Sequence, residues 1–404
     1  MIASSPPPES SPDLPTRLRP IRSVAIIGLG LIGGSLARDL NAASDLMLIS
    51  WDQDAETRAE AQAAGIPVAE TLADCVAGEP DLIVLAVPLA AMRAVCVELA
   101  PLVAGHTLVT DVGSVKGPVR ETVVASGLGE RYVGSHPMAG TEATGFAAST
   151  PGMFQNAAWV VTVAASAHAA STHPASAHPA VADSAQVDCP AELEAALVIA
   201  ELVTRVLGVR VYVLSDDQHD EAVALISHLP HVLAAELLGL AALSPVRDVA
   251  LALAAGSFRD GTRVAGTNPA RTEAMVTGNA AWVAPLVEKA ATRLQTLAAQ
   301  LRAGDDVSDF FAPHISPLTA EVPAPDASEP GAADPGASDP DVPTSDIPRT
   351  PDTARAPETP PASETVTAAA MAPPALRTLL LDVAANGRAI RAVDLRTPTI
   401  TLAP

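Results

Sequence analysis

One short segment near the start of the chain limits the possible folds more than any other. Residues 23–27 (SVAII) form an apolar run, GLGLIG at 28–33 follows it, and the helical pattern SLARDL comes next. In this context the first glycine permits a tight strand-to-helix turn, the second lets a pyrophosphate approach the backbone, and the third lets helix and strand pack closely. The helix N-terminus then offers free amides to phosphate. The segment predicts a dinucleotide-binding (Rossmann) domain.

A carboxylate follows at the distance that this prediction requires. Asp52 ends the next apolar run, LMLISWD, about 20 residues further on, where it can bind the ribose hydroxyls of adenosine. Its charge would repel a 2′-phosphate, and Arg58 is not immediately adjacent to it, so NAD is favoured over NADP. The run LIVLAVP ends beside the cofactor in such domains. We expect the cofactor to be bound by Gly28, Gly30, Leu31, Ile32, Gly33, Asp52, Val87 and Pro88.

Strand-like and helical patterns alternate after this motif. Such alternation predicts parallel βαβ units, and therefore an α/β fold in which residues 21–215 are a Rossmann NAD-binding domain. The strand-like runs lie at 23–27, 46–51, 82–87, 107–110, 132–134, 159–163 and 210–214.

The pattern changes to helical from residue 216 to residue 302, with Ala- and Leu-rich faces and breaks at Pro245, 256–266 and Pro269. We expect an all-helical C-terminal domain at 216–312 that binds substrate. Its helices carry more apolar surface than a single layer can bury, which predicts that this domain forms a homodimer.

Three segments have compositions that do not support a packed core. Residues 1–20 are rich in Pro and Ser, 164–190 in Ala, Ser, His and Pro, and 313–374 in Pro, Asp, Ala, Ser and Thr. We expect a disordered leader, a low-complexity insertion and a disordered Pro-rich tail. Residues 375–404 regain an apolar pattern around an Asn-Gly turn, and they predict a small element of unknown role.

The sequence predicts no metal site. Three histidines between 168 and 178 recur every five residues, but drift of a low-complexity insertion explains this spacing better than metal capture does. Three cysteines are too few and too widely spaced for a disulfide framework or a zinc site, and they suit a reducing cytosol. We expect buried thiols at Cys75, Cys96 and Cys189.

Charge limits the choice of partners. The chain carries 24 basic and 46 acidic residues, a formal net charge of −22 that would repel nucleic acid and anionic membranes. We find neither an uninterrupted apolar run of about 18 residues nor a signal peptide, so a soluble, cytoplasmic protein with a small-molecule substrate is expected. An anionic substrate would need a local cationic pocket, which makes each Arg or His in a motif informative.

Two of the expected strand ends carry unusual polar clusters, DVGSVK at 111–116 and GSHPMAGTE at 134–142. The carboxyl ends of strands face the ligand crevice in open α/β sheets, which places Ser114 and His136 where a substrate meets the nicotinamide. Oxidation of a secondary alcohol by hydride loss requires a base near the hydroxyl, and a neutral histidine suits that role near pH 7. Taken alone, a histidine before proline at a strand end is more often structural.

The helical domain adds a second polar cluster. Relative to His219, and at about 100° per residue, Ser227 lies at about 80°, His231 at about 120° and His228 at about 180°. His219, Ser227 and His231 can therefore share a face, and Pro230 should kink the helix there.

A third polar motif, SFRDGTR at 257–263, is expected to form a turn between helices. Its two arginines suit a dicarboxylate substrate, because arginine makes bidentate, charge-assisted bonds to carboxylates.

Together these motifs resemble those of the prephenate/arogenate dehydrogenase family. GLGLIGGSLA, DVGSVK, GSHPMAGTE, MFQNAAWVV, the HD…SHLPH helix and SFRDGTR occur in the order of that family and cover residues 21–302. The resemblance implies a Rossmann domain joined to a helical dimerisation domain, with the active site between them. The implied reaction is the NAD-dependent oxidative decarboxylation of prephenate to 4-hydroxyphenylpyruvate, or of arogenate to tyrosine, in tyrosine biosynthesis.

The resemblance also assigns roles to single residues. His136 would accept the proton of the substrate's ring hydroxyl, Ser114 would assist, and Arg263 would hold a substrate carboxylate. The substrate side of the site would be lined by His231, Ser227 and His219.

Two other functions remain open at this stage. Another Rossmann dehydrogenase with a helical C-terminal domain, such as a β-hydroxyacid dehydrogenase, would typically place a catalytic lysine in the second domain, where only Lys289 is present, late in the final helix. A non-catalytic NAD-sensing protein would have no reason to keep Ser114, His136, His231 and Arg263 together. No residue in the sequence indicates whether prephenate or arogenate is the preferred substrate.

Overall fold

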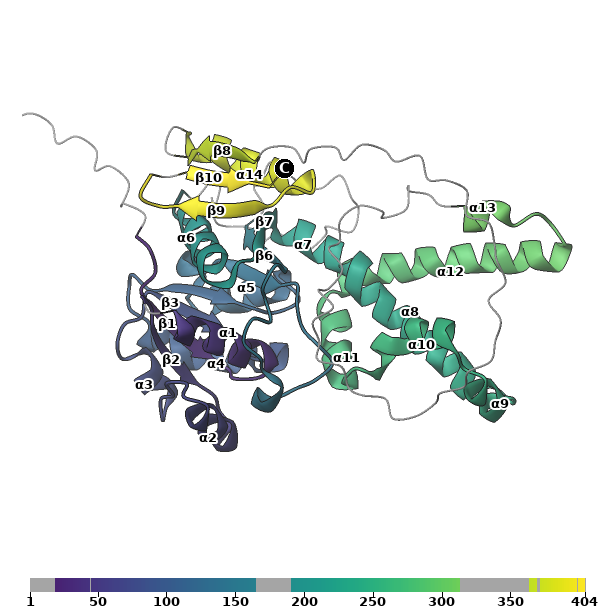
Figure 1. Cartoon of the computed structure of the whole chain (residues 1–404). Helices are drawn as coiled ribbons and strands as arrows, with labels where there is room; N and C mark the ends of the chain where they lie inside the picture. The colour runs from purple at the N-terminus through teal and green to yellow at the C-terminus, as the bar shows by residue number, and fades with distance from the viewer. Residues whose placement is uncertain are drawn as a thin grey trace, which may run out of the picture. The chain divides into compact units, whose positions relative to one another are not determined.

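The computed structural model describes residues 19–43, 45–164, 190–312, 363–368, 371–397 and 399–403 (Figure 1). Most of the expected leader, the insertion with its spaced histidines, Cys189 and most of the Pro-rich segment lie outside the described residues. The chain forms two compact units, one of Met1–Glu288 with Ala362–Pro404 and one of Lys289–Pro361.

The first unit begins with a parallel sheet in the strand order β2-β1-β3-β4. These strands begin close to the positions expected from the sequence, and helices connect them, which confirms a Rossmann-type α/β domain. The strands are β1 (Ser23–Ile27), β2 (Met47–Trp51), β3 (Leu82–Leu85) and β4 (Leu108–Asp111), and the helices are α1 (Leu31–Ala42), α2 (Ala55–Ala63), α3 (Leu72–Val76), α4 (Leu89–Leu99) and the short 3-10 helix η1 (Ala100–Leu102).

Helices bury this sheet on both faces, which explains why its strands are apolar throughout rather than alternating. Val24 and Ile26 of β1 pack into one core cluster, whereas Ala25 and Ile27 point the other way into a second cluster. The second cluster also holds Cys75 and Cys96, both buried free thiols as expected.

A second sheet continues from the first in the order β5-β6-β7-β9-β10-β8. The two sheets join where the Val133 amide donates to the Val109 carbonyl, at 3.0 Å. Its first three strands are β5 (Gly134–Pro137), β6 (Ala158–Val163) and β7 (Arg210–Ser215), accompanied by α5 (Gly117–Ala125), η2 (Gly129–Arg131), η3 (Phe146–Ala148) and α6 (Pro190–Leu207).

The expectation of parallel pairing throughout is wrong at β5. This strand pairs antiparallel with β6, because only a loop with one 3-10 turn connects the two and no helix crosses over. Helix α6 supplies the crossover that makes β6 and β7 parallel.

The C-terminal residues complete this second sheet. β8 (Glu364–Thr367), α14 (Pro373–Ala385), β9 (Ile390–Asp394) and β10 (Thr399–Leu402) lie beside α6 and β7 (Figure 1). Here the structure differs from the sequence expectation, since β8 lies within the segment expected to be a linker and the Asn-Gly turn joins a helix to a strand. Leu376, Leu380 and Ile400 belong to the main core cluster, so this element is part of the domain's packing.

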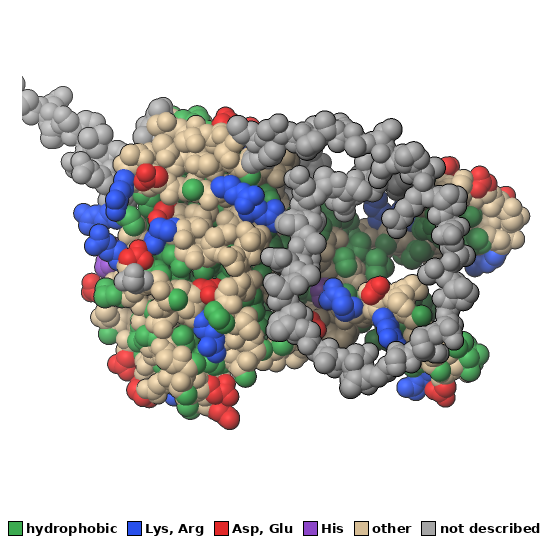
Figure 2. Space-filling model, in the orientation of Figure 1, with side chains coloured by type: hydrophobic (Ala, Val, Ile, Leu, Met, Phe, Trp, Pro, Cys, Tyr) green, Lys and Arg blue, Asp and Glu red, His purple; other side chains and the backbone are tan. Residues whose placement is uncertain are grey.

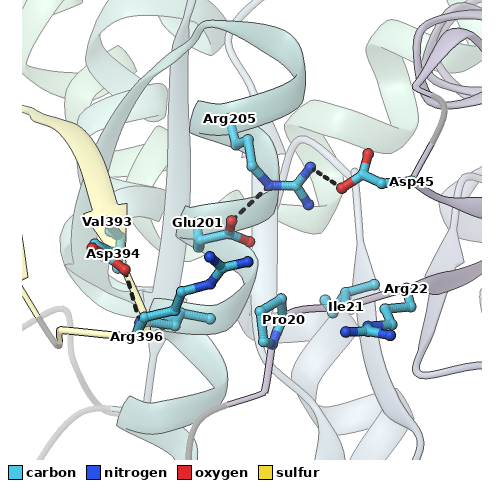
Figure 3. Close-up of a pocket in the computed structure, with 10 residues that line it drawn as sticks. Pro20, Ile21, Arg22, Asp45, Glu201, Arg205, Val393, Asp394 and Arg396 are labelled. Carbon is cyan, nitrogen blue, oxygen red and sulfur yellow. Dashed lines mark hydrogen bonds and ion pairs between the residues drawn. The ribbon is translucent and has the colours of Figure 1, made fainter.

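A hollow of about 700 Å³ opens between this element and the rest of the domain (Figure 3). Six of the ten residues that line it have charged side chains. Arg205 joins two of the carboxylates, donating to Glu201 at 2.6 Å and to Asp45 at 2.8 Å. None of the expected cofactor or catalytic residues lines this hollow.

The helical part begins with one continuous helix from Asp216 to Ala242. It consists of α7 (Asp216–Val223), a π-helical turn η4 (Ala224–His228) and α8 (Leu229–Ala242). Ser215 and Gln218 form a capping box that fixes its start. The sequence predicts a kink at Pro230, which has no amide hydrogen to donate. The structure instead keeps the helix continuous and has a wider π turn just before this proline.

Shorter helices follow, and one of them corrects the sequence analysis. The residues of SFRDGTR do not form a turn, because Gly256–Thr262 is helical (α10) and Arg263–Gly266 continues as a 3-10 helix (η5). Gly261 lets α10 approach α8 closely, since a Cβ there would lie 3.2 Å from Leu237. The other helices are α9 (Arg247–Ala252), α11 (Pro269–Gly278), α12 (Ala280–Ala303) and α13 (Ser308–Phe311).

In the second unit, the described residues are the end of α12 and α13. The rings of Phe310 and Phe311 pack edge to face, and the Arg293 guanidinium lies over Phe310.

Apolar side chains are exposed along the continuous helix of the first unit and in α9 (Figure 2). Leu240 is 63% exposed, and Leu243 at the end of α8 is 89% exposed. Within the described residues, this helix is the one that is long and apolar enough to cross a membrane by length and composition, and 22% of its most apolar window is buried.

Candidate functional site

The glycine-rich loop has the geometry that a dinucleotide requires. Gly28 has a φ of +101°, and a Cβ on Gly33 would lie 2.0 Å from the Gly28 carbonyl oxygen, so both positions exclude larger residues. A Cβ on Gly30 would meet nothing within 4 Å. Open space therefore lies at the N-terminus of α1, where the amides of Leu31 and Ile32 have no partner within the helix and can bind a pyrophosphate.

Asp52 lies beside this loop at the end of β2. Its Oδ2 atom accepts the Leu29 amide at 2.7 Å, and its Oδ1 atom accepts the Asp54 amide at 2.9 Å. The carboxylate is half-buried and keeps lone pairs for ribose hydroxyls. The assumption that Arg58 is not adjacent is wrong, because one turn of α2 brings its Nη1 atom to 2.8 Å from the Asp52 carbonyl oxygen.

The other residues that the sequence predicts to bind the cofactor lie near this loop. The Cγ1 atom of Val87 would lie 3.1 Å from a Cβ on Gly28, and Pro88 immediately precedes α4. Ile32 faces Gly140, where a Cβ would lie 3.6 Å from its Cδ1 atom. The loop that follows β5 therefore lies against the first turn of α1, which brings the strand of His136 to the cofactor loop.

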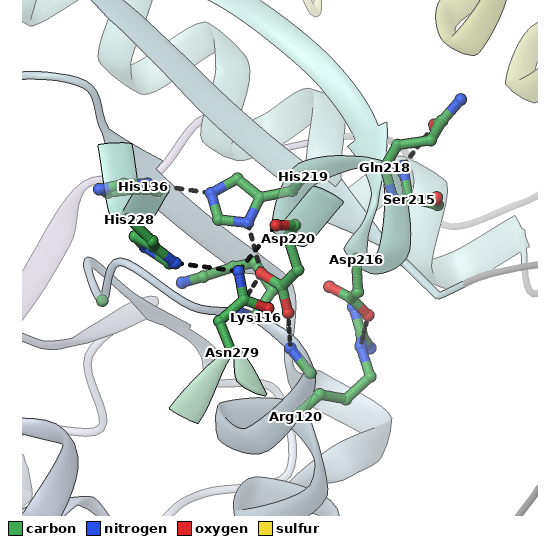
Figure 4. A network of polar contacts seen from close by, with 12 residues as sticks. Lys116, Arg120, His136, Ser215, Asp216, Gln218, His219, Asp220, His228 and Asn279 are labelled. Carbon is green, nitrogen blue, oxygen red and sulfur yellow. Dashed lines mark hydrogen bonds and ion pairs between the residues drawn. The ribbon is translucent and has the colours of Figure 1, made fainter. Parts of the chain in front are cut away.

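His136 lies half-buried on β5, and its imidazole meets the helical part of the chain. Its Nδ1 atom is 2.9 Å from Nε2 of His219 on α7 (Figure 4). Desolvation lowers the pKa of His136 well below its ordinary value, and the nearby Lys116 ammonium lowers it further. The ring is therefore neutral near pH 7, and a neutral ring can accept a proton.

His219 and Asp220 continue this chain of contacts. Nδ1 of His219 is 2.7 Å from Oδ1 of Asp220, so both ring nitrogens of His219 have protein partners. The Asp220 carboxylate also accepts the Lys116 amide at 2.8 Å and the Gly117 amide at 2.9 Å. Although desolvation raises the pKa of Asp220, the bond from His219 and those two amides outweigh it, and the pKa lies below its ordinary value.

A buried ion pair supports the loop between β4 and α5. The Lys116 ammonium is fully buried, pairs with Asp111, and donates to the Ser135 carbonyl at 2.7 Å. Tyr132 donates its hydroxyl hydrogen to Asp111 at 2.8 Å, because burial and that carboxylate raise the pKa of the phenol and keep it protonated. This pair fixes the strand ends that carry Ser114 and His136.

Asn279 and His228 are members of the site that the sequence analysis did not select. Asn279 is buried at the end of α11, and its side-chain amide donates to the Asp220 carbonyl at 2.8 Å and lies 3.0 Å from Nδ1 of His228. Regular helical spacing placed His228 opposite His219. The π turn at Ala224–His228 has more residues per turn, which rotates His228 toward this network.

The other predicted residues have no side-chain hydrogen bond that links them to His136 in the described part of the chain. Ser114 is half-buried in the loop after β4, and Ser227 is half-buried in the π turn. Nδ1 of His231 donates to the Ser227 carbonyl at 2.8 Å, which leaves Nε2 of His231 as a free acceptor. Arg263 is exposed at the start of η5, which packs against the helix of His231.

These groups can perform acid–base chemistry beside a bound dinucleotide. The neutral imidazole of His136 can accept a proton, and the exposed guanidinium of Arg263 can pair with an anionic substrate. Among the described residues, no cluster of three or more His, Cys, Asp or Glu side chains could hold a metal ion.

Two family models match the chain. Residues 36–172 match the nucleotide-binding domain of prephenate dehydrogenase, and residues 215–312 match its dimerization domain.

Characterised relatives agree with these matches. The cyclohexadienyl dehydrogenase of Zymomonas mobilis is 32% identical over 72% of this chain and 92% of its own length. The prephenate dehydrogenase of Lactococcus lactis is 29% identical over 61% of each chain.

Solved structures have the same fold. A structure from Corynebacterium glutamicum named as a prephenate dehydrogenase is 34% identical, with a TM-score of 0.62, and the match covers 72% of this chain and 85% of that one. The arogenate dehydrogenase of Synechocystis is 28% identical, with a TM-score of 0.56 and coverage of 70% and 92%. The prephenate dehydrogenase of Aquifex aeolicus, in complex with hydroxyphenyl propionate and NAD+, is 25% identical, with a TM-score of 0.60 and coverage of 72% and 95%.

Proposed function

Because the chain belongs to the prephenate dehydrogenase family, we propose that His136 is the group that accepts the proton of the substrate's ring hydroxyl. The chain is an NAD-dependent oxidoreductase of tyrosine biosynthesis. The observation that carries the proposal is the 2.9 Å contact of the His136 imidazole, whose pKa is lowered, with His219 of the helical part, on a strand whose following loop lies against α1.

The reaction leaves the protein one proton to manage. The substrate ring loses a hydride from the carbon that bears the hydroxyl, and the hydroxyl proton passes to His136. The ring carboxylate leaves as CO2, its bonding electrons complete the aromatic ring, and the phenolate oxygen that forms takes the proton back from His136, so no proton is gained or lost overall. NAD supplies the hydride acceptor when it is bound. Aromatisation favours the products strongly, so the side chains mainly have to position the reacting groups and accept the proton.

The other site residues would bind the substrate. Ser114 lies in the loop after β4 and would hydrogen-bond the ring hydroxyl or His136. Arg263 would pair with a carboxylate, which its exposure and its position beside the helix of His231 support. The free Nε2 of His231 would accept a hydrogen bond from the substrate or the nicotinamide amide, and Ser227 would hold His231 through its carbonyl group.

The glycine-rich loop would hold the pyrophosphate through Gly28, Gly30, Leu31, Ile32 and Gly33, and Val87 with Pro88 would border it. Asp52 would bind the adenosine ribose, and its negative charge favours NAD over NADP.

The ring chemistry is the same for prephenate and arogenate, which differ by a keto or an amino group on the side chain. The similarity to a cyclohexadienyl dehydrogenase and to an arogenate dehydrogenase supports testing both substrates. Steady-state reduction of NAD and of NADP with each substrate measures both preferences in one experiment.

The substitution His136→Asn tests the proton-acceptor role. We expect kcat to fall by about 10²- to 10⁴-fold, the usual contribution of a general base, while NAD affinity stays nearly unchanged. Arg263→Ala should mainly raise KM. His106→Asn, at an exposed histidine, is the control and should leave both constants unchanged. A His136→Asn variant with wild-type kcat would contradict the proposal.

We also propose that the protein is a cytoplasmic homodimer. The matched dimerization domain and the exposed leucines of α8 support the homodimer. The excess of acidic residues and the reduced thiols Cys75 and Cys96 support a cytoplasmic location without nucleic acid or membrane partners.

A further inference from the structure

We infer that Asp220 and His219 are positioning residues that fix which nitrogen of His136 carries the hydrogen, and so leave Nε2 of His136 free to accept the substrate's proton. The inference rests on the proposed role of His136. Asp220 and His219 act through His136 and do not touch the substrate.

The assignment follows from the donors and acceptors along the chain of contacts. Asp220 is ionised, because two backbone amides and His219 all donate to its carboxylate. Nδ1 of His219 must therefore carry a hydrogen. In the arrangement that we infer, this is the only ring hydrogen of His219, which leaves its Nε2 atom as an acceptor. Only a hydrogen on Nδ1 of His136 can satisfy the 2.9 Å contact to that acceptor. The lone pair of His136 then lies on Nε2, at the far side of the ring.

The same contacts stabilise the charge that forms during turnover. When Nε2 of His136 takes a proton, the imidazolium keeps its bond to His219, and the negative charge of Asp220 lies next in the chain. A charge in this partly water-excluded place interacts more strongly with a carboxylate than it would in water.

The anchoring of Asp220 makes the arrangement rigid. Its carboxylate binds the amides of Lys116 and Gly117 at the start of α5, and its carbonyl group accepts the Asn279 side chain. The start of α5, helix α7 and the end of α11 therefore meet at Asp220, which is 4% exposed. His219 is 1% exposed and has no spare ring nitrogen for a substrate.

Variants of His219 separate positioning from simple packing. His219→Gln keeps an amide oxygen that can accept from Nδ1 of His136, whereas His219→Leu fills the space with no acceptor. We expect kcat to fall by about 100-fold in His219→Leu, with partial recovery in His219→Gln and little change in KM for NAD. Equal activity in the two variants would overturn the inference.

A double-mutant cycle tests whether Asp220 acts through His219. Asp220→Asn should lower kcat by about 10- to 100-fold in the wild-type background and hardly at all in the His219→Leu background. Full additivity of the two losses would overturn the inference. Equilibrium unfolding in urea identifies any variant that has lost the fold.

Nitrogen NMR spectra of histidine-labelled wild-type protein report the ring hydrogens directly. We expect His136 to carry its hydrogen on Nδ1, and a hydrogen on Nε2 would overturn the inference. In the wild-type protein, the charged or titratable groups that face His136 are Lys116, His219 and His228. The acidic limb of the pH profile of kcat should therefore shift when His219 is replaced in His219→Leu. Wild-type activity of His136→Asn would instead remove the proposed function on which the inference rests.

Discussion

Two histidines, His136 and His228, are expected to make the stability of this protein depend on pH. Desolvation lowers the pKa of His136 well below its ordinary value and lowers the pKa of His228 to about 4. The motif around His136 can be recognised in the sequence, but its partners cannot, because His219 is 83 positions away and Asn279 joins His228 from another helix. The network exists only after three separate segments have folded together.

The free energy of unfolding should fall as the pH is lowered from about 6.5 to about 4. Both histidines are neutral in the folded state and protonate in the unfolded chain within this window, so the unfolded state binds more protons. Each contributes at most about 1.4 kcal/mol per pH unit. Urea titrations across this range measure the slope, which His228→Asn should reduce and the exposed His106→Asn should not. A flat profile in the wild-type protein would contradict the pKa directions.

At the level of elements, the sequence predicted best where local geometry decides. The segment from β1 through the glycine-rich loop to α1 was predicted correctly, because the turn, the positive φ and the close helix packing each require glycine at one position. The sequence pattern was misleading for SFRDGTR, which was expected to form a turn between helices. Packing of α10 against α8 favours a helix there. The direction of β5 also depended on its connection rather than on its residues.

Two glycine substitutions in this loop should have opposite effects. Gly33→Ala forces a methyl group against the Gly28 carbonyl and should destabilise the fold by about 1–3 kcal/mol. Gly30→Ala meets open space and should leave stability nearly unchanged while it weakens NAD binding. Urea unfolding and calorimetric NAD titration of both variants distinguish these results. Normal NAD affinity in Gly30→Ala would show that the pyrophosphate lies elsewhere.

On the scale of the whole molecule, residues distant in sequence complete one domain. The C-terminal strands extend the second sheet, where Ile390 of β9 pairs with Val211 of β7. Leu380→Ala on α14 should therefore lower the free energy of unfolding of the entire first unit by about 2–5 kcal/mol. Single-transition urea unfolding, monitored by tryptophan fluorescence, measures this. A separate early transition would show that the C-terminal element unfolds independently.

The exposed leucines of α8 give a prediction for the assembly. Leu240→Glu combined with Leu243→Glu should convert the proposed dimer into a monomer, because charges at a buried apolar interface lose their hydration without gaining a partner. Sedimentation at micromolar concentration measures the mass. Met47→Glu, at an exposed methionine on β2, is the matched control and should stay dimeric. A wild-type protein that sediments as a monomer would refute the homodimer.

The amino-acid sequence alone determined the Rossmann motif and the α/β and helical parts, because these depend on residue types at fixed local spacings. His136, Ser114 and Arg263 stay predictions that the sequence makes from its motifs. Only the tertiary structure showed that His219 contacts both His136 and Asp220, that a π turn rotates His228 toward this network, and that the C-terminal strands join the second sheet. Those features arise from contacts between segments that are far apart in the chain, and local sequence patterns do not predict such contacts.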